Sequence, residues 1–241
     1  MISSNVISQA ARRNQTTELN IAREYCQHLF LGAFYRESGS EKVMFKGGTA
    51  FRIVYGSPRF SEDMDFSGFQ TSIREIEDWV ASAAGEMERN AIPVSFGESK
   101  GTSGGYLAII ASPVHGLPVQ IQIQVSLRRR GDVNGQGVLV TPELLPGYTL
   151  TQLPERLLVE EKLEALMTRR KPRDYYDLYF MLRKGLIPTD MKGPLRQAKE
   201  ALVESRIDFG RDLGPFLPRS QATIARDLRK TLLEELARHG I

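Results

Sequence analysis

Two aspartates and two adjacent glycines lie within one stretch of the sequence, FKGGTAFRIVYGSPRFSEDMDFSG, which covers residues 45–68. On a strand, Asp63 and Asp65 point to one face, while Met64 and Phe66 point to the other face and into a core. Neighbouring carboxylates repel each other and commonly hold a proton or a cation between them. Their hard oxygens suit Mg²⁺, which binds one or two carboxylates together with substrate phosphates. An exposed strand with an acidic turn is the alternative that the aspartate pair alone leaves open.

The glycines add a second feature to this stretch. Gly47 and Gly48 follow a predicted short strand, VMF, and precede a predicted helix from Thr49 to Tyr55, which we expect Thr49 to cap. Backbone N–H groups without side chains can approach a phosphate closely, and a helix N-terminus favours negative charge. The spacing is not that of a Walker A loop. The glycines therefore predict either a different phosphate cradle or a plain tight turn, and the nearby carboxylates favour the cradle.

The hydrophobic pattern predicts the elements that position these residues. In the first part of the chain we expect helices at 16–38 and 72–90, and strands at 62–66, 105–110 and 118–127. After about residue 150 the strand signals fade, and the remaining segments predict helices at 154–170, 173–185, 193–205 and 221–240. We therefore expect an α/β portion over residues 1–150 and a helical domain over residues 151–241.

The helical portion contains a second polar motif. Lys162 shares a helical row with Leu158 and Leu166, so it either extends past the edge of a core or contacts a phosphate. Pro172 predicts a helix start, which gives Asp174 a place in the first turn, where a negative charge favours the helix dipole. The neighbouring tyrosines are predicted to be packing residues.

Composition limits the classes of protein that fit. Hydrophobic residues make up 41% and charged residues 25%, as in ordinary globular proteins, and no apolar run reaches the roughly 20 residues that cross a bilayer. The N-terminus does not resemble a secretory signal, and the only cysteine, Cys26, is predicted to be a buried thiol, so we expect a cytoplasmic location without membrane partners. The net charge of +3 permits a nucleic-acid partner. Arginine clusters at 128–130 and 169–173 are either phosphate contacts or solvated loops.

Two segments carry a resemblance to a known family. FKGGTAFRIVYGSPRFSEDMDF and EEKLEALMTRRKPRDYYDLYFM resemble the KGGT…RxSEDxDF and K…RDxYDL motifs of AbiEii/AbiGii-type toxins, and REYCQHLFLGAF is also similar. These toxins are nucleotidyltransferases of type IV toxin–antitoxin or phage-defence systems, related to the DNA polymerase β superfamily. The resemblance covers roughly residues 20–185. It implies an α/β (α+β) nucleotidyltransferase fold, with a small mixed sheet flanked by helices and a helical C-terminal domain.

The resemblance also implies an activity. The chain would transfer a nucleotide from a nucleoside triphosphate to an acceptor hydroxyl on RNA, with tRNA as the first expectation, and a cognate antitoxin would be its partner. Mg²⁺ would be the cofactor, with Mn²⁺ as the alternative ion. Gly47, Gly48 and Thr49 would hold the triphosphate, and Asp63 and Asp65 would ligate the metal and take part in catalysis. The other matching positions are Lys46 and Arg59 flanking the nucleotide, Lys162 at its phosphates, and Asp174 in the catalytic set, with Asp177 one turn further on.

One strand departs from the superfamily pattern. Related polymerases often place a third carboxylate on a later strand, whereas the strand VQIQIQVSLR offers Gln124 on its polar face. An amide oxygen can coordinate a metal but carries no charge and cannot act as a base. Two further functions therefore stay open: transfer to a small-molecule or protein acceptor, and a nucleotide- or RNA-binding module that has lost catalysis.

Overall fold

The computed structural model describes residues 1–128 and 133–241, and Arg129 and Arg130 of the first arginine cluster lie outside the described residues. The described chain divides into two compact units. Unit 1 comprises Met1–Gly56 and Phe60–Pro154, and unit 2 comprises Glu155–Ile241 together with the short segment Ser57–Arg59. Each unit is described by itself below.

Unit 1 combines one mixed sheet with helices. Its helical elements are α1 (Ser4–Arg13), α2 (Glu18–Phe34), the 3₁₀ turn η1 (Ser40–Lys42), α3 (Gly47–Ile53) and α4 (Ile73–Arg89). Its strands are β1 (Val43–Lys46), β2 (Asp63–Phe69), β3 (Ser95–Thr102), β4 (Gly105–Ala111), β5 (Gln120–Arg128), β6 (Gln136–Val140) and β7 (Tyr148–Gln152). Among the described residues these strands form a seven-stranded sheet in the order β3-β4-β5-β2-β1-β7-β6.

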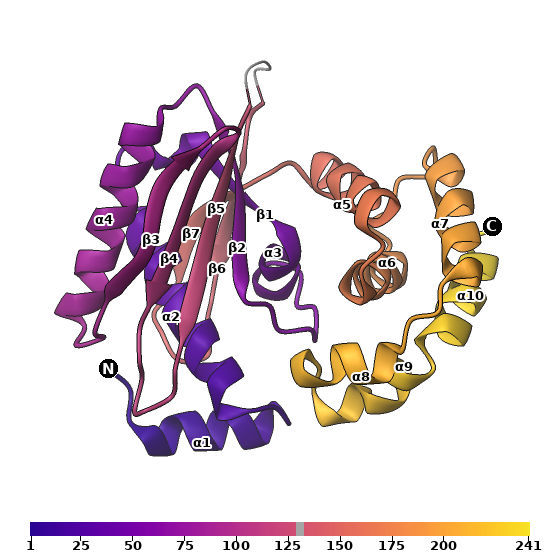
Figure 1. Ribbon diagram of the computed structural model, residues 1–241, viewed down its shortest axis with the longest axis horizontal. Helices are drawn as coiled ribbons and strands as arrows, with labels where there is room; N and C mark the ends of the chain where they lie inside the picture. The colour runs from indigo at the N-terminus through magenta and orange to yellow at the C-terminus, as the bar shows by residue number, and fades with distance from the viewer. Residues whose placement is uncertain (129–132) are drawn as a thin grey trace. The chain divides into compact units, whose positions relative to one another are not determined.

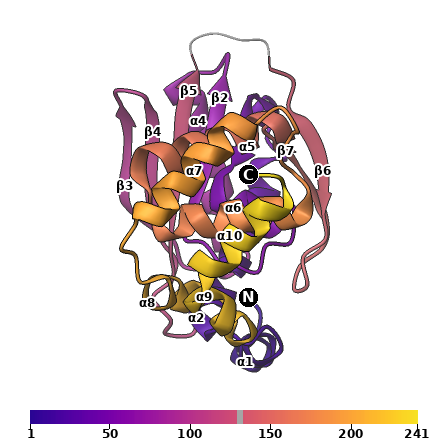
Figure 2. The ribbon, with the colours of Figure 1, turned by 90° about the vertical axis from the view of Figure 1, so that its right-hand side faces the viewer.

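The sheet brings β2 to its centre, between β1 and β5. β2 runs antiparallel to β1 and parallel to β5, and β1 in turn runs parallel to β7. β3 and β6 form the two opposite edges of the sheet (Figure 2). Because polar groups on β2 have strands on both sides, residues of β1 and β5 flank them directly.

The hydrophobic core of unit 1 lies under one face of the sheet. Phe66 of β2 contacts Phe34 of α2, with ring centroids 5.7 Å apart, and Phe34 also contacts Trp79 of α4. Helix α3 lies on the opposite side of the sheet from α4 (Figure 1). Helix α4 begins with a capping box, in which Ser72 accepts from the N–H of Glu75 and the Glu75 carboxylate accepts from the N–H of Ser72.

Unit 2 is helical. Its elements are α5 (Glu155–Arg169), α6 (Pro172–Lys184), α7 (Lys192–Glu204), α8 (Phe209–Leu213), η2 (Gly214–Phe216), η3 (Arg219–Gln221), α9 (Ala222–Arg226) and α10 (Leu228–Arg238). Tyr175 and Tyr176 of α6 are 0% and 1% exposed, which confirms that they are packing residues. Tyr175 meets Phe209 edge to face.

Several sequence-based expectations differ from the structure. The helix expected at 221–240 is two helices, because residues 222–226 and 228–238 form α9 and α10 on either side of Asp227. Thr49 does not cap α3: the helix begins at Gly47 with Lys46 as its N-cap, and the Thr49 hydroxyl donates to the carbonyl oxygen of Asp63 on β2. Helices α1 and α8 and strands β3, β6 and β7 were not predicted. Among the described residues, no helix combines the length and the apolar character that a membrane span needs.

Candidate functional site

The aspartate pair lies on the central strand of the sheet, as the alternation of DMDF predicted. Met64 and Phe66 are 0% and 1% exposed and belong to the core, whereas Asp63 and Asp65 are half-buried on the other face. We call that side of the sheet the carboxylate face.

Register places two rows of side chains on the carboxylate face. The first row joins the Cα partners Lys46 of β1, Asp65 of β2, Gln124 of β5 and Leu107 of β4. The second row joins Asp63, Gln122 and Ile109. Partners in neighbouring strands share a face and have backbones about 4.8 Å apart. A cation therefore flanks Asp65 on one side and an amide flanks it on the other.

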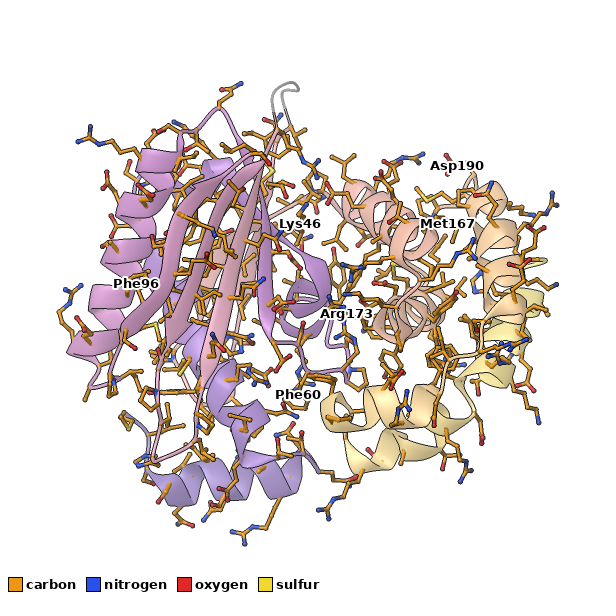
Figure 3. All side chains as sticks on the ribbon, viewed as in Figure 1. Lys46, Phe60, Phe96, Met167, Arg173 and Asp190 are labelled. Atoms are coloured by element: carbon orange, nitrogen blue, oxygen red, sulfur yellow. The ribbon has the colours of Figure 1, made fainter. Side chains whose placement is uncertain are left out.

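The glycines lie against this pair. β1 ends at Lys46, and the chain turns directly into α3 (Figure 3, where Lys46 is labelled). Gly47 has a φ of +82°, and a Cβ added to it would lie 2.8 Å from the Cβ of Asp65. A side chain at position 47 would thus be strained and would collide with the carboxylate. Gly48 and Thr49 follow as buried residues at the start of α3.

Unit 2 contains a separate, buried charge cluster. The Asp177 carboxylate accepts from Nε and Nη2 of Arg59, both at 2.9 Å, and from Nζ of Lys162 at 2.6 Å. The side chains of Asp177, Arg59 and Lys162 are only 1%, 4% and 8% exposed. Burial is the largest single influence on the Asp177 pKa and would raise it, but the two cations together lower it below its usual value.

Asp174 has different partners from those of Lys162. Its carboxylate accepts from Nε and Nη2 of Arg169 at 2.9 and 2.7 Å, and from the backbone N–H of Lys171. Asp174 thus closes the first turn of α6, in line with the position that Pro172 predicted for it.

Sequence reasoning did not identify Asp177 as the partner of Lys162. A signal was present, because Phe180 and Met181, three and four residues further along α6, are buried core residues. An acidic residue on that side of the helix requires a buried cation. The pairing of Gln122 with Asp63 was also missed, because the alternation within each strand gives its two faces but not its neighbour in the sheet.

A cavity of about 380 Å³ lies elsewhere in unit 1, between α2, the end of α3 and residues 139–145. Its polar wall contains the ion pair of Arg52 with Glu24, in which Nε and Nη2 donate at 3.0 and 3.1 Å. It also contains His28, whose pKa is lowered to about 4 by burial and by Arg52, and which is hydrogen-bonded to Tyr148. Among the described residues, none of the predicted site residues lines this cavity, so we centre the candidate site on the carboxylate face.

Comparison with protein families identifies the chain. The family described as "Nucleotidyl transferase AbiEii toxin, Type IV TA system" matches residues 29–239. The chain belongs to this family. It is therefore a nucleotidyl transferase toxin of the AbiEii family, and membership implies a nucleoside triphosphate substrate and a partner antitoxin.

Solved structures support the fold of this AbiEii-family protein. The crystal structure of JHP933 from Helicobacter pylori superposes with a TM-score of 0.66 at 20% identity, covering 93% of this chain and 92% of that one. A putative nucleotidyltransferase from H. pylori gives 0.63 at 19% identity, with 93% and 94% covered. MenT4, the nucleotidyltransferase toxin Rv2826c from Mycobacterium tuberculosis H37Rv, gives 0.66 at 15% identity, with 99% and 93% covered. A comparison with curated proteins found no match.

Proposed function

We propose that this AbiEii-family toxin transfers a nucleotide from a nucleoside triphosphate to a hydroxyl group of RNA, with tRNA as the first expected acceptor. The observation that carries the proposal is the close approach of Gly47 to Asp65, which joins a side-chain-free backbone to a carboxylate pair. Backbone N–H groups at 47–49 would bind the triphosphate beside the carboxylates. The first unit would then be the transferase core.

The oxygens on the carboxylate face fit a Mg²⁺ ion, or Mn²⁺ in its place. Asp63 and Asp65 supply two hard carboxylate oxygens on one strand, and their Cα partners on β5, Gln122 and Gln124, add no further negative charge. Within the described residues there is no group of three or more His, Cys, Asp or Glu side chains that could hold a metal. A set of two carboxylates completed by substrate phosphates is typical of Mg²⁺. When bound, the ion would neutralise charge on the triphosphate.

The proposed transfer makes one bond and breaks another. The acceptor oxygen forms a bond to the α-phosphorus, the bond between that phosphorus and the bridging oxygen breaks, pyrophosphate leaves, and the hydroxyl proton passes to water. Backbone N–H groups of Gly47 and Gly48 and the Lys46 ammonium would stabilise the phosphate charge. Arg59 and Lys162 belong to unit 2, where both are buried against Asp177, so their role at the phosphates stays a prediction. Asp174 stays a predicted member of the catalytic set.

Radiolabel transfer tests this proposal. The purified protein is incubated with total RNA, Mg²⁺ and each α-³²P-labelled nucleoside triphosphate in turn, alongside the variants Asp63→Ala and Asp78→Ala. Asp78 is an exposed carboxylate on α4 and serves as the matched control. We expect wild type and Asp78→Ala to label a discrete RNA band and Asp63→Ala to leave it unlabelled. Transfer by Asp63→Ala at the wild-type rate would refute the site.

The same experiment separates the other two functions. Labelling that is independent of RNA and insensitive to salt would identify a small-molecule or protein acceptor. Triphosphate binding without any labelled product would identify a binding module without catalysis, for which Gln124 beside Asp65 is the structural reason.

A further inference from the structure

A hollow of about 280 Å³ opens on unit 1 next to the aspartates but does not contain them. It lies beside the turn of the β3–β4 hairpin and along β5 from Gln122 to Ser126. The residues that line it are Thr102, Gly104, Tyr106, Leu107, Gln122, Gln124, Val125 and Ser126. Two of them, Gln122 and Gln124, are the Cα partners of Asp63 and Asp65. The hollow therefore begins one strand away from the carboxylate pair.

Because β2 lies between β1 and β5, the carboxylates have a β1 side and a β5 side, and we expect a different reactant on each. On the β1 side, Gly47 brings bare backbone against Asp65. That side is the one proposed to hold the triphosphate. In a transfer reaction the second reactant must reach the α-phosphorus from another direction, and the β5 side borders the same two aspartates. The hollow on the β5 side is therefore placed for the acceptor.

The lining of the hollow fits a neutral polar ring system. None of its residues is charged: two carry amides, three carry hydroxyls, and Leu107 and Val125 are apolar. Each glutamine amide offers two N–H donors and a carbonyl acceptor, which matches the edge of a nucleobase. Its volume is close to the lower end of the range for ligand pockets, about 300 Å³, so it has room for one nucleoside rather than for several nucleotides.

We propose that this hollow binds the nucleoside that carries the accepting hydroxyl, and that Gln122 and Gln124 hydrogen-bond its base. The inference rests on the proposed function and adds to it the residues that select the acceptor. It also gives Gln124, which stands where related polymerases have a third carboxylate, a function of its own. An amide beside Asp65 can bind a base without adding negative charge next to a phosphodiester chain.

The experiment compares steady-state constants for acceptor and donor separately. The acceptors are four RNA oligonucleotides that differ only in the terminal nucleoside, and the proteins are wild type, Gln122→Ala, Gln124→Ala and Gln120→Ala. Gln120 is the matched control, because it lies on the same strand and the same face, is exposed, and does not line the hollow. Each alanine variant removes the hydrogen bonds of one glutamine amide; Gln122 is half-buried and Gln124 is exposed.

We expect wild type to prefer one terminal nucleoside. Gln122→Ala and Gln124→Ala should raise the acceptor KM by about 5- to 15-fold, reduce that preference, and leave the triphosphate KM within about twofold. Gln120→Ala should behave as wild type. Normal acceptor KM values and an unchanged preference in both variants would overturn this inference alone. Failure of wild type to label any RNA would overturn the proposed function, and the inference with it.

Discussion

Asp177 is a buried carboxylate that forms ion pairs with both Arg59 and Lys162 in unit 2. Replacing it by asparagine leaves two buried cations without that negative charge. We expect Asp177→Asn to lower the free energy of unfolding by about 3 to 5 kcal/mol, measured by urea denaturation. Asp174→Asn is the matched comparison, because its partner Arg169 is 39% exposed, and it should cost about 1 to 2 kcal/mol. Equal losses in the two variants would contradict the central role given to Asp177.

The pKa of Asp177 adds a pH dependence to this comparison. Although burial acts to raise the pKa, Arg59 and Lys162 lower it below its usual 3.8. The unfolded chain therefore takes up this proton at a higher pH than the folded chain. The stabilisation is fully present above a pH of about 4 and is lost as the pH falls through the lowered value. The difference in unfolding free energy between wild type and Asp177→Asn should be constant from about pH 5 to 8 and should narrow below about pH 4.

Gly47 allows a second comparison between single residues. Gly47 and Gly56 have similar φ angles of +82° and +74°, but an added Cβ meets Asp65 at Gly47 and nothing within 4 Å at Gly56. Both alanine variants should lose about 1 to 2 kcal/mol of stability through backbone strain. Only Gly47→Ala should also displace Asp65 and weaken Mn²⁺ binding, followed by electron paramagnetic resonance. If the Mn²⁺ affinity of Gly47→Ala is unchanged, the contact between position 47 and Asp65 does not affect metal binding.

At the scale of elements, the local hydrophobic pattern was sufficient to predict β2, β4, β5 and α4, and the helices α5, α6 and α7 of unit 2. Alternation in DMDF and in the glutamine strand gave the correct face for each side chain, because one face of each strand is buried. It could not give the parallel pairing of β2 with β5, since partners more than fifty residues apart leave no local signal. The pairing is what sets Gln124 beside Asp65.

The strands that were missed have weaker local signals than β2 and β5. β3, with the sequence SFGESKGT, is exposed at nearly every position and has no apolar face to reveal it. β6 and β7 are each only five residues long. The Thr49 hydroxyl was assigned to a cap by its place in the chain, yet it bonds to Asp63 on another strand. In the same way, Asp177 rather than Asp174 meets Lys162, which depends on how α5 packs on α6.

The β2–β5 register makes a prediction about the metal. Gln124→Glu would add a third carboxylate directly beside Asp65, whereas Gln120→Glu adds the same charge about 13 Å further along the strand. We expect Gln124→Glu to raise Mn²⁺ affinity severalfold in a calorimetric titration without nucleotide or RNA, and Gln120→Glu to have little effect. If both variants bind Mn²⁺ as wild type does, Asp63 and Asp65 are not the centre of the metal site.

At the scale of the whole molecule, charge divides between the two units. Unit 2 contains 19 lysines and arginines against 14 aspartates and glutamates, whereas unit 1 contains 13 against 15. The surplus of positive charge is thus in the helical unit, although the carboxylates proposed for the metal are in the other. Several cations of unit 2 serve internal ion pairs, as Arg169 does with Asp174. Lys171, at the start of α6, is exposed.

If RNA is the acceptor, we expect the surplus positive charge of unit 2 to strengthen binding of the RNA and to have little effect on binding of the triphosphate. Reversing the charge in Lys171→Glu should raise the acceptor KM several-fold at low salt and make its dependence on salt less steep, because fewer counterions are released on binding. Arg74→Glu, at an exposed position of unit 1, introduces the same change in net charge and should alter neither value. Acceptor KM values measured between about 50 and 200 mM salt provide the comparison. Equal effects of the two variants would mean that only the net charge of the molecule matters, and that the helical unit does not hold the RNA.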